Sequence, residues 1–580
     1  MKKALMIFVA TFVAIAVAMP ALAAVEFQYG GVFRTRWITS NNLNDGSSDI
    51  QDNNNMFDQR LRLYLTFKAS ENLKVVWKAE IGNVTWGSFK GGRMGADDVN
   101  VKTKNAYVQF NIPNTPTTAI IGIQGISLLN SWLVDDDFSA AAFVTKIDNF
   151  TITLAYIAGQ NYPDSTGNET ESYYSSTKDN VDDYAFAVTY DQKGMPIKGT
   201  LTGVFMNANM VPWAIYPDVM QSPINGAAWP AGVTSTASMP GVFISGNYYN
   251  PYANTGLIGW NLADANLIGV NWLGNKLDAV KNNQMFDLGF NLTYKIDWLS
   301  AYINFAKNIG SVKTATRQLV GVAVGAAPSF TPVYGSFVGN TPFANVGQVQ
   351  DLDYTGWMID AGVNYFCGPY TFNLGGFYTS GQKASEQRVY LYDGGVNTGL
   401  YYVTKRYQST DNVDFFTYPG TTSKYFSEIV GGGILDAAGP FMSAAAGRDG
   451  SNYWRGYGFP SNLWTITAGA AWQVLEKTKL SFSYWYFQTS ESVGTGRFNM
   501  NTLEEQMAND IGHEFNLYLT QGIVDGLTLD IVGAFLFTGD AYARTGYLTF
   551  WRQGANYYAS PVTWSKDNVY EVGARLQWDF

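Results

Sequence analysis

The chain of 580 residues is 46% hydrophobic and 16% aromatic but only 14% charged, far below the roughly 25% charge of an ordinary soluble domain. Its net charge of −10 argues against nucleic-acid binding, which requires a basic surface. The single cysteine, Cys367, and the single histidine, His513, exclude an intramolecular disulfide, thiolate-rich or multi-histidine metal sites and covalent haem attachment. We therefore expect no metal and no cofactor.

The first 23 residues have the pattern of a cleaved signal peptide. Lys2 and Lys3 precede the apolar run 5–17, and the small residues 21–23 (Ala-Leu-Ala) form a processing site. An uncleaved membrane anchor is the alternative, but the run is short and ends in this site. We predict that residues 1–23 are removed, which leaves a mature chain of net charge −12, because −10 loses the two lysines. No later run reaches the about 18 apolar residues of a helical membrane span.

Beyond the signal, apolar and polar residues alternate in short runs along the chain. Successive side chains of a strand point to opposite faces, so each run predicts a strand with one apolar and one polar face. The predicted strands cover about residues 27–39, 57–68, 73–81, 104–111, 119–126, 140–147, 150–158, 183–191, 197–206, 286–296, 299–308, 357–367, 370–379, 463–474, 478–488, 513–520, 527–538 and 570–580.

The predicted connections alternate in length. Every even-numbered strand is joined to the next by a short turn, at residues that include 69–72, 147–149, 192–196, 296–298, 368–369, 475–477 and 524–526. The other connections are long and rich in Gly, Asn, Ser, Tyr and Pro, and they include 40–56, 207–285, 311–354, 381–462 and 539–568. Bacterial outer-membrane barrels combine an even strand number with short periplasmic turns and long external loops.

In lipid, only a closed barrel gives every main-chain group of such strands a partner. We therefore predict an all-β fold, a transmembrane antiparallel β-barrel of about 18 strands, with 16 as the alternative. Because the first strand starts directly after the signal, residues 24–580 are expected to form a single barrel domain. A barrel this wide is expected to hold water, since its wall side chains cannot fill it.

The last strand places Tyr570, Val572, Trp578 and Phe580 on one face. A chain that ends in this alternating pattern on an aromatic residue resembles the closing strand of Gram-negative outer-membrane barrels, where a terminal Phe belongs to the assembly signal. An ordinary edge strand is the alternative. The resemblance implies that Trp578 and Phe580 are part of the signal that the barrel assembly machinery recognises. It also implies that the mature protein lies in the outer membrane, in contact with lipid and lipopolysaccharide.

Four short segments carry a family resemblance, namely residues 57–63 (FDQRLRL), 512–518 (GHEFNLY), 527–530 (LTLD) and 537–540 (FTGD). With the predicted architecture, they make the chain similar to large Gram-negative porins and, more loosely, to alginate-export-type porins. The resemblance implies passive diffusion of small hydrophilic solutes through a water-filled channel, in a homotrimer or a monomer. It transfers no substrate-binding motif.

The strand faces predict which charges line the lumen. In the strands at 27–39, 57–68, 73–81 and 570–580, one face of each is apolar and the other is polar and basic. Closure of the barrel would unite the basic faces in one wall, which we call the basic wall and which comprises Arg34, Arg36, Arg60, Arg62, Lys74, Lys78 and Arg575. Such a wall can favour anions, because guanidinium groups bind carboxylate and phosphate. Alternatively, these cations pair with acids such as Asp58, Glu80, Glu514 and Glu571 and stiffen the lumen.

The sequence predicts a loop at residues 127–139, which carries Asp135, Asp136 and Asp137. By similarity to general porins, where an inward loop brings acids opposite a basic wall, this loop is the candidate constriction. The alternatives are a solvated external loop and a divalent-cation site, although the spacing of an EF-hand is absent.

Two other functions were weighed against the porin. An outer-membrane hydrolase would need a catalytic histidine, but His513 and Glu514 are adjacent on a strand and point to opposite faces. No G-x-S-x-G nucleophile motif occurs either. We therefore predict no enzyme and no catalytic residue. The remaining alternative is a barrel that sheathes a partner protein, such as an electron-transfer or secretion complex.

Overall fold

The structure is a computed structural model. It describes residues 25–43, 53–88, 91–94, 99–161, 180–208, 280–316, 319–324, 330–334, 337–338, 341–342, 348–381, 391–392, 400–401, 412–417, 424–435, 461–499, 504–542, 549–553, 556–560 and 566–580. The predicted signal peptide lies outside these ranges, as do large parts of the predicted long connections, and it stays a prediction.

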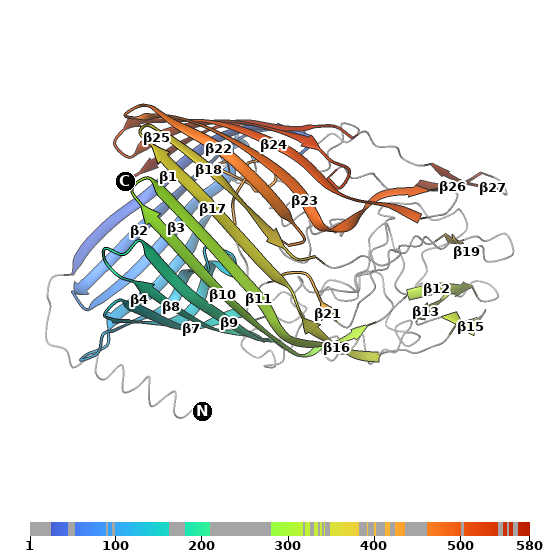
Figure 1. Ribbon diagram of the computed structural model, residues 1–580, viewed down its shortest axis with the longest axis horizontal. Helices are drawn as coiled ribbons and strands as arrows, with labels where there is room; N and C mark the ends of the chain where they lie inside the picture. Colours follow the sequence, from blue (N-terminus) through green and yellow to red (C-terminus); the bar gives the residue numbers. More distant parts are fainter. Residues whose placement is uncertain are drawn as a thin grey trace.

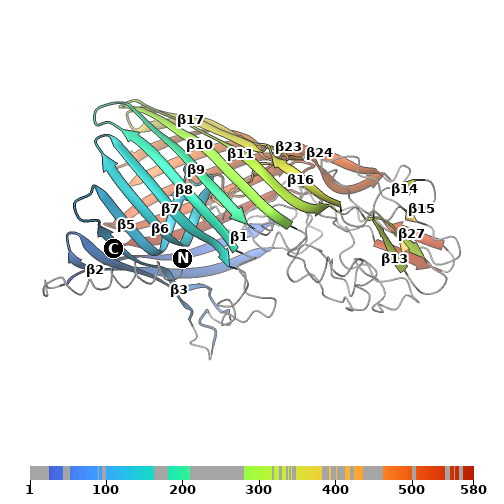
Figure 2. The same ribbon diagram turned by 90° about the horizontal axis from the view of Figure 1, so that it is seen from below.

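Eighteen wall positions form one closed antiparallel barrel (Figures 1 and 2). The wall strands are β1 (Glu26–Asn41), β2 (Asn54–Ser70), β3 (Leu73–Thr85), β4 (Val101–Asn111), β5 (Thr117–Leu128), β6 (Val134–Ile147), β7 (Phe150–Asn161), β8 (Asn180–Asp191), β9 (Ile197–Ala208), β10 (Val280–Ile296), β11 (Leu299–Thr316), β17 (Trp357–Cys367), β18 (Tyr370–Thr379), β22 (Trp464–Leu475), β23 (Thr478–Asn499), β24 (Glu504–Val524), β25 (Leu527–Thr538) and β28 (Val569–Asp579). The predicted fold class and the strand number of 18 are confirmed.

Each wall strand pairs with its neighbours in sequence order, and β1 closes the ring by pairing with β28. The end of the chain takes part in this closure, because the main-chain N–H of Phe580 donates to Gly31 O (3.0 Å) and Gly31 N–H donates to Phe580 O (2.8 Å). The role of Trp578 and Phe580 in assembly remains a prediction.

The remaining strands are short. β16 (Gln348–Tyr354) directly precedes β17 and, like β17, pairs with β11, so the two strands together form one position of the wall. β21 (Asn412–Val413) pairs with β16. Separate two-stranded sheets join β12 (Leu319–Val324) to β13 (Phe330–Tyr334), β14 (Phe337–Val338) to β15 (Thr341–Pro342), β19 (Leu391–Tyr392) to β20 (Leu400–Tyr401) and β26 (Thr549–Gln553) to β27 (Asn556–Ser560).

The wall is interrupted between β16 and β17 at Gly356. A Cβ at this position would lie 2.3 Å from Phe415 O and 2.4 Å from Asn308 Oδ1. Glycine is therefore the residue that lets the segment containing Phe415 pass close to the wall.

The predicted short turns all join the strands that they were expected to join. Cys367 ends β17 beside one of these turns and is exposed. Strand ends differ more from prediction on the side of the long connections, where β10, β11, β23 and β24 run several residues beyond the predicted limits.

The two faces of the wall differ as the alternation predicts. Leu154, Leu374 and Leu517 point outward and are 55%, 56% and 58% exposed. Asn304, Asp360 and Glu514 point inward and are buried. An apolar outer surface and a polar inner one are the arrangement that a lipid bilayer selects in a membrane barrel.

Because the outer face is apolar, a charged side chain placed on it should lower the stability of the barrel in lipid. Leu374 lies midway along β18, so Leu374→Arg should lower the free energy of unfolding from lipid vesicles by about 2–4 kcal/mol. Met195→Arg is the matched control, since Met195 is 47% exposed in a turn beyond the strands and should change little. If the two substitutions lowered the free energy of unfolding equally in urea titrations, the outer face of β18 would not contact lipid.

Candidate functional site

Three chain segments that are not part of the wall pack inside the barrel. The inward turn (Leu129–Leu133) connects β5 to β6, and the other two, residues 412–417 and the hook (residues 424–435), belong to the connection between β18 and β22. Trp132, Phe416 and Ile429 are fully buried and belong to one apolar cluster with inward-facing wall residues. The described part of the lumen is thus narrowed by packed chain rather than filled with water alone.

The wall leaves room for these segments by carrying small side chains where they pack. The inward residues of this kind are Ala140, Ala142, Ala185, Ala306 and Ala534, each at most 7% exposed. A pore-facing position bathed in water has no need of alanine, so this run of small apolar residues on lumen faces was a signal in the sequence that something packs inside.

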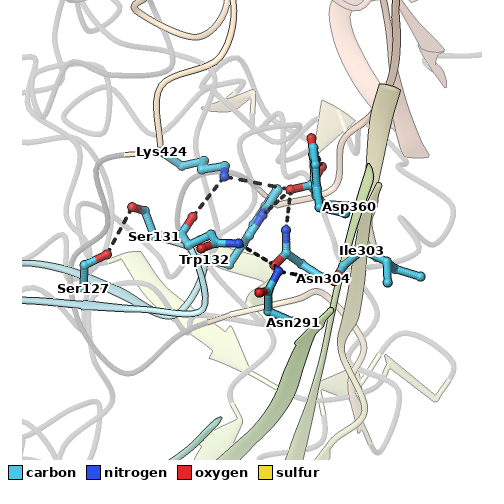
Figure 3. A network of polar contacts seen from close by, with 10 residues as sticks. Ser127, Ser131, Trp132, Asn291, Ile303, Asn304, Asp360 and Lys424 are labelled. Atoms are coloured by element: carbon cyan, nitrogen blue, oxygen red, sulfur yellow. Dashed lines mark hydrogen bonds and ion pairs between the residues drawn. The ribbon is translucent and has the colours of Figure 1, made fainter. Parts of the chain in front are cut away.

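The inward turn reaches across to the opposite wall and ends in a polar network (Figure 3). Trp132 Nε1 donates to Asp360 Oδ2 (2.8 Å), and Asn304 Nδ2 donates to the same oxygen (3.0 Å). Asn130 and Asn291 both donate to Asn304 Oδ1, at 2.9 and 2.8 Å. Since Asn291, Asn304 and Asp360 lie on β10, β11 and β17, the turn is tied to three neighbouring wall strands.

Lys424 joins the hook to the inward turn. Its Nζ donates to Asn130 O (3.0 Å), lies 5.1 Å from the centre of the Trp132 ring and is 3.9 Å from Asp360 Oδ2. Burial lowers the pKa of Lys424, while the carboxylates of Asp360 and Asp135 act in the opposite direction. The two inward segments therefore share one cation and form a single constriction.

Beyond Lys424, the hook is bound by Glu514 of β24. Oε1 of Glu514 accepts the main-chain N–H groups of Glu428 (2.8 Å) and Ile429 (3.0 Å), and Oε2 accepts that of Val430 (3.0 Å). Three convergent N–H donors are a strong site for a buried carboxylate, because charge-assisted hydrogen bonds offset its desolvation.

The far end of the hook is held by two arginines of the basic wall. Arg575 Nη1 donates to Ile434 O (3.2 Å), and Arg36 Nη1 donates to Leu435 O. Leu435 packs against Ile38 of β1, together with Val532 of β25. Two members of the predicted basic wall therefore bind the protein's own main chain.

The pairing of β28, β1, β2 and β3 brings the predicted basic residues onto one face, with Arg36 opposite Arg575 and Arg34 opposite Arg60. Lys74 lies near the short-turn end of this face, opposite Lys68. Lys78 stacks over the Tyr64 ring at 5.1 Å.

Ion pairs with carboxylates hold several of these cations within the described ranges. Arg36 pairs with Asp58, Arg62 Nε lies 2.9 Å from Glu80 Oε2, and Arg575 Nη2 lies 2.8 Å from Asp530 Oδ2. Asp58 and Glu80 are partners that the sequence suggested, whereas Asp530 is not.

The other two suggested acids behave differently. Glu514 binds the hook, and Glu571 is fully buried, with no hydrogen-bond partner for either carboxylate oxygen in the part of the chain that the structure describes.

The three aspartates of the predicted constriction loop lie on β6, directly after the inward turn. They pair in register with Ser127, Ile126 and Gly125 of β5. Asp137 bonds to β4, through Lys104 Nζ (2.7 Å) and Asn105 Nδ2 (2.6 Å). The part of residues 127–139 that enters the lumen is thus the mainly apolar turn with its single amide, Asn130, and the acids follow it on the wall.

Carboxylates also gather on the wall opposite the basic one. Asp183, Asp287 and Asp360 face inward from β8, β10 and β17, each at most 4% exposed. Asn308 Nδ2 donates to Asp287, while Asn308 also binds Thr417 of the segment 412–417, whose N–H donates to Asn308 Oδ1 (3.0 Å). The lumen therefore has a basic side and an acidic side.

His513 faces away from the lumen. Its Nδ1 is 2.8 Å from the Tyr484 hydroxyl, and its ring lies 4.9 Å from that of Tyr486. Glu514, the next residue, faces inward to the hook, so the two do not form a catalytic pair. In the described ranges no three His, Cys, Asp or Glu residues are grouped to bind a metal ion.

No helix in the described ranges has the length and apolar character needed to cross a membrane.

The closed antiparallel wall, its apolar outer face, its short turns at one end and its polar lumen define the class of protein: a large transmembrane β-barrel of the outer-membrane type. No protein-family model and no curated protein matches the chain.

Among solved structures, the chain is similar to the outer-membrane protein OpdK of Pseudomonas aeruginosa, with 7% identity, 96% of this chain and 98% of that chain covered, and a TM-score of 0.42. It is also similar to OccAB4 of Acinetobacter baumannii, with 9% identity, 96% and 98% covered, and a TM-score of 0.40. OmpT of Vibrio cholerae follows with 8% identity, 96% and 100% covered, and a TM-score of 0.33. Similarity this low says nothing about substrate, selectivity or functional residues.

Trp132 should be an anchor of the constriction. Trp132→Phe keeps an aromatic ring, but it removes the buried donor to Asp360 and leaves a void, which together should lower the free energy of unfolding by at least about 1–2 kcal/mol. Trp77→Phe is the control, because its Nε1 donates to Thr103 Oγ1 (3.2 Å) on the exposed outer face. A smaller loss for Trp132→Phe than for Trp77→Phe in denaturant titrations would contradict the assignment.

Proposed function

We propose that the protein is an outer-membrane porin through which small hydrophilic solutes diffuse passively. The observation that supports this most is the combination of a closed barrel with an apolar outer face and a charged inner face that the chain's own segments narrow. Such a wall crosses a bilayer and offers water-soluble molecules a polar path. The lipid and lipopolysaccharide around it, the assembly machinery and a trimeric or monomeric state belong to the same proposal.

The hook and the inward turn favour a porin over the two alternatives. They occupy the lumen and bind both walls, which leaves less space for a sheathed partner protein. His513 faces outward and Glu514 holds the hook, so these two residues do not form the catalytic pair that a hydrolase would need. We therefore propose a channel without covalent chemistry.

The proposed solutes carry negative charge. Arg62 forms an ion pair, yet its side chain keeps 32% of its surface exposed, and Arg60 lies beside it on β2. Exposed guanidinium groups can bind carboxylate or phosphate bidentately as a solute passes. The extension to anionic polysaccharides rests only on the looser resemblance to alginate-export-type porins.

Single-channel recording in a planar bilayer with a salt gradient tests this proposal. The wild type should conduct with an anion-favouring reversal potential. In Arg60→Ala/Arg62→Ala the anion-to-cation permeability ratio should fall by at least about fivefold, because each of the two lost unit charges contributes about 1 kcal/mol at about 4 Å from an ion in water. High salt should reduce the difference through screening.

Lys193→Ala/Lys477→Ala removes the same charge from exposed short turns and is the matched control. A conducting channel whose selectivity is equal in all three proteins would leave the porin standing and refute the anion preference. Absence of conductance from correctly folded wild type would refute the porin.

A further inference from the structure

The hook is a self-contained unit. The Glu428 carboxylate accepts the N–H groups of Ile434 (3.0 Å) and Leu435 (2.6 Å), and Gly433 N–H donates to Ser427 O (2.8 Å). Gly433 has a φ of +30°, and a Cβ there would lie 2.1 Å from Glu428 Oε2, so glycine allows this tight closure. Burial raises the pKa of Glu428, and the bonds from Leu435 and Ile434 oppose that rise. These internal bonds do not need the wall.

The wall binds the hook mainly through main-chain atoms at both ends, and Tyr518 of β24 adds a side-chain hydrogen bond to the Glu428 carboxylate. Glu514 accepts three N–H groups, while Arg36 and Arg575 donate to two carbonyls. If the hook left as a unit, these charged side chains would face a wide lumen where water could replace the lost bonds. Hydrogen bonds to water replace part of what is lost, so each charged bond favours the bound state by only about 1.5–3 kcal/mol, or about 10- to 150-fold.

One buried group favours release. Glu571 is 0% exposed, and neither of its carboxylate oxygens has a hydrogen-bond partner among the described residues; it lies opposite Ser40, whose buried hydroxyl also lacks one there. Glu571 points inward from the same strand as Arg575, which holds Ile434 of the hook. A buried carboxylate without a hydrogen-bond partner destabilises the state that buries it, and the nearby charge of Arg36 offsets only part of this effect. Water that enters on release would solvate it.

We propose that the hook is a detachable gate of the channel, which Glu514, Arg36 and Arg575 hold closed through its main chain. The gate rests on the proposed porin function, because it regulates passage through the same lumen. Its two states are the hook bound to the wall and the hook displaced as one unit, a change that also breaks the contacts of Lys424 with Asn130 and Asp360. The inward turn remains tied to β10, β11 and β17 and forms the fixed side of the constriction.

A graded pair of variants tests the hold of Glu514. Glu514→Gln keeps one carbonyl oxygen but replaces the acceptor of Val430 N–H by a donor, and Glu514→Ala removes all three acceptors. The open probability in single-channel recordings should rise by about tenfold in Glu514→Gln, since a charged hydrogen bond is lost, and further in Glu514→Ala. Open probabilities equal to wild type in both folded variants would overturn the gate.

A reversible lock gives an independent test that does not depend on removing a buried charge. Ile38→Cys/Leu435→Cys, in a Cys367→Ser background, places two thiols in the cluster where the hook packs on the wall. Val532→Cys/Leu435→Cys is a second pair in the same cluster. Each single variant is the control, and mass spectrometry confirms which pair closes. The oxidised double variant should lose its large openings, and a reductant should restore them.

The outcomes separate the two proposals. If the oxidised and reduced channels conduct alike, the hook is no gate but the porin stands. If neither the cysteine variants nor the wild type conduct, oxidised or reduced, the proposed porin function is refuted.

Discussion

The pairing of β1 with β28 is the constraint on which the rest of the structure depends. Within a bilayer, an unpaired strand edge leaves N–H and C=O groups without partners, at a cost of several kcal/mol each. Ten register pairs between the first and last wall strands remove that edge. Closure also brings Arg575 beside Arg36, although the two are at opposite ends of the sequence. The barrel, its basic wall and the anchor of the hook therefore arise from one set of main-chain bonds.

Closure at this strand number creates a second problem, which is the width of the lumen. The side chains of an 18-stranded wall cannot meet across it. The protein narrows this space with its own connections, and the inward faces of β6, β8, β11 and β25 carry alanine where those connections pack. Apolar contacts supply the packing, while Asp360 and Glu514 fix the positions of the inward turn and the hook. Shape and charge of the passage are thus set by residues from different parts of the chain.

Much of the wall could be predicted from the sequence, because the alternation of apolar and polar residues in a membrane strand is a local pattern of consecutive residues. The strands 357–367, 370–379 and 527–538 were predicted with the limits that they have. Asp58 and Glu80 were suggested as acids for the basic wall, and the structure pairs them with Arg36 and Arg62. Asp530 was missed as the partner of Arg575, because the alternating pattern does not fix the register of β25 against β28.

The hook could not be predicted, because it has no periodic pattern of its own. Its position depends on Glu514, which is 84 to 86 positions away from the amides that it binds. Likewise, the acids at 135–137 drew attention to residues 127–139, but the side chains that bridge the lumen are Asn130 and Trp132. Charge is conspicuous in a sequence, whereas an amide or indole that binds a distant strand is not.

The two arginines that hold the hook and the arginines of β2 illustrate how one wall serves two roles. Arg36 and Arg575 lie at the same level of the barrel, where they meet both their acid partners and the hook carbonyls. Arg60 and Arg62 lie further along β2 toward the short turns, beyond the level of the hook. Under the proposed porin function, a solute that passes the hook from the side of the long connections would meet the cations of β2 next. The size and the charge of the passage would then be set by different residues.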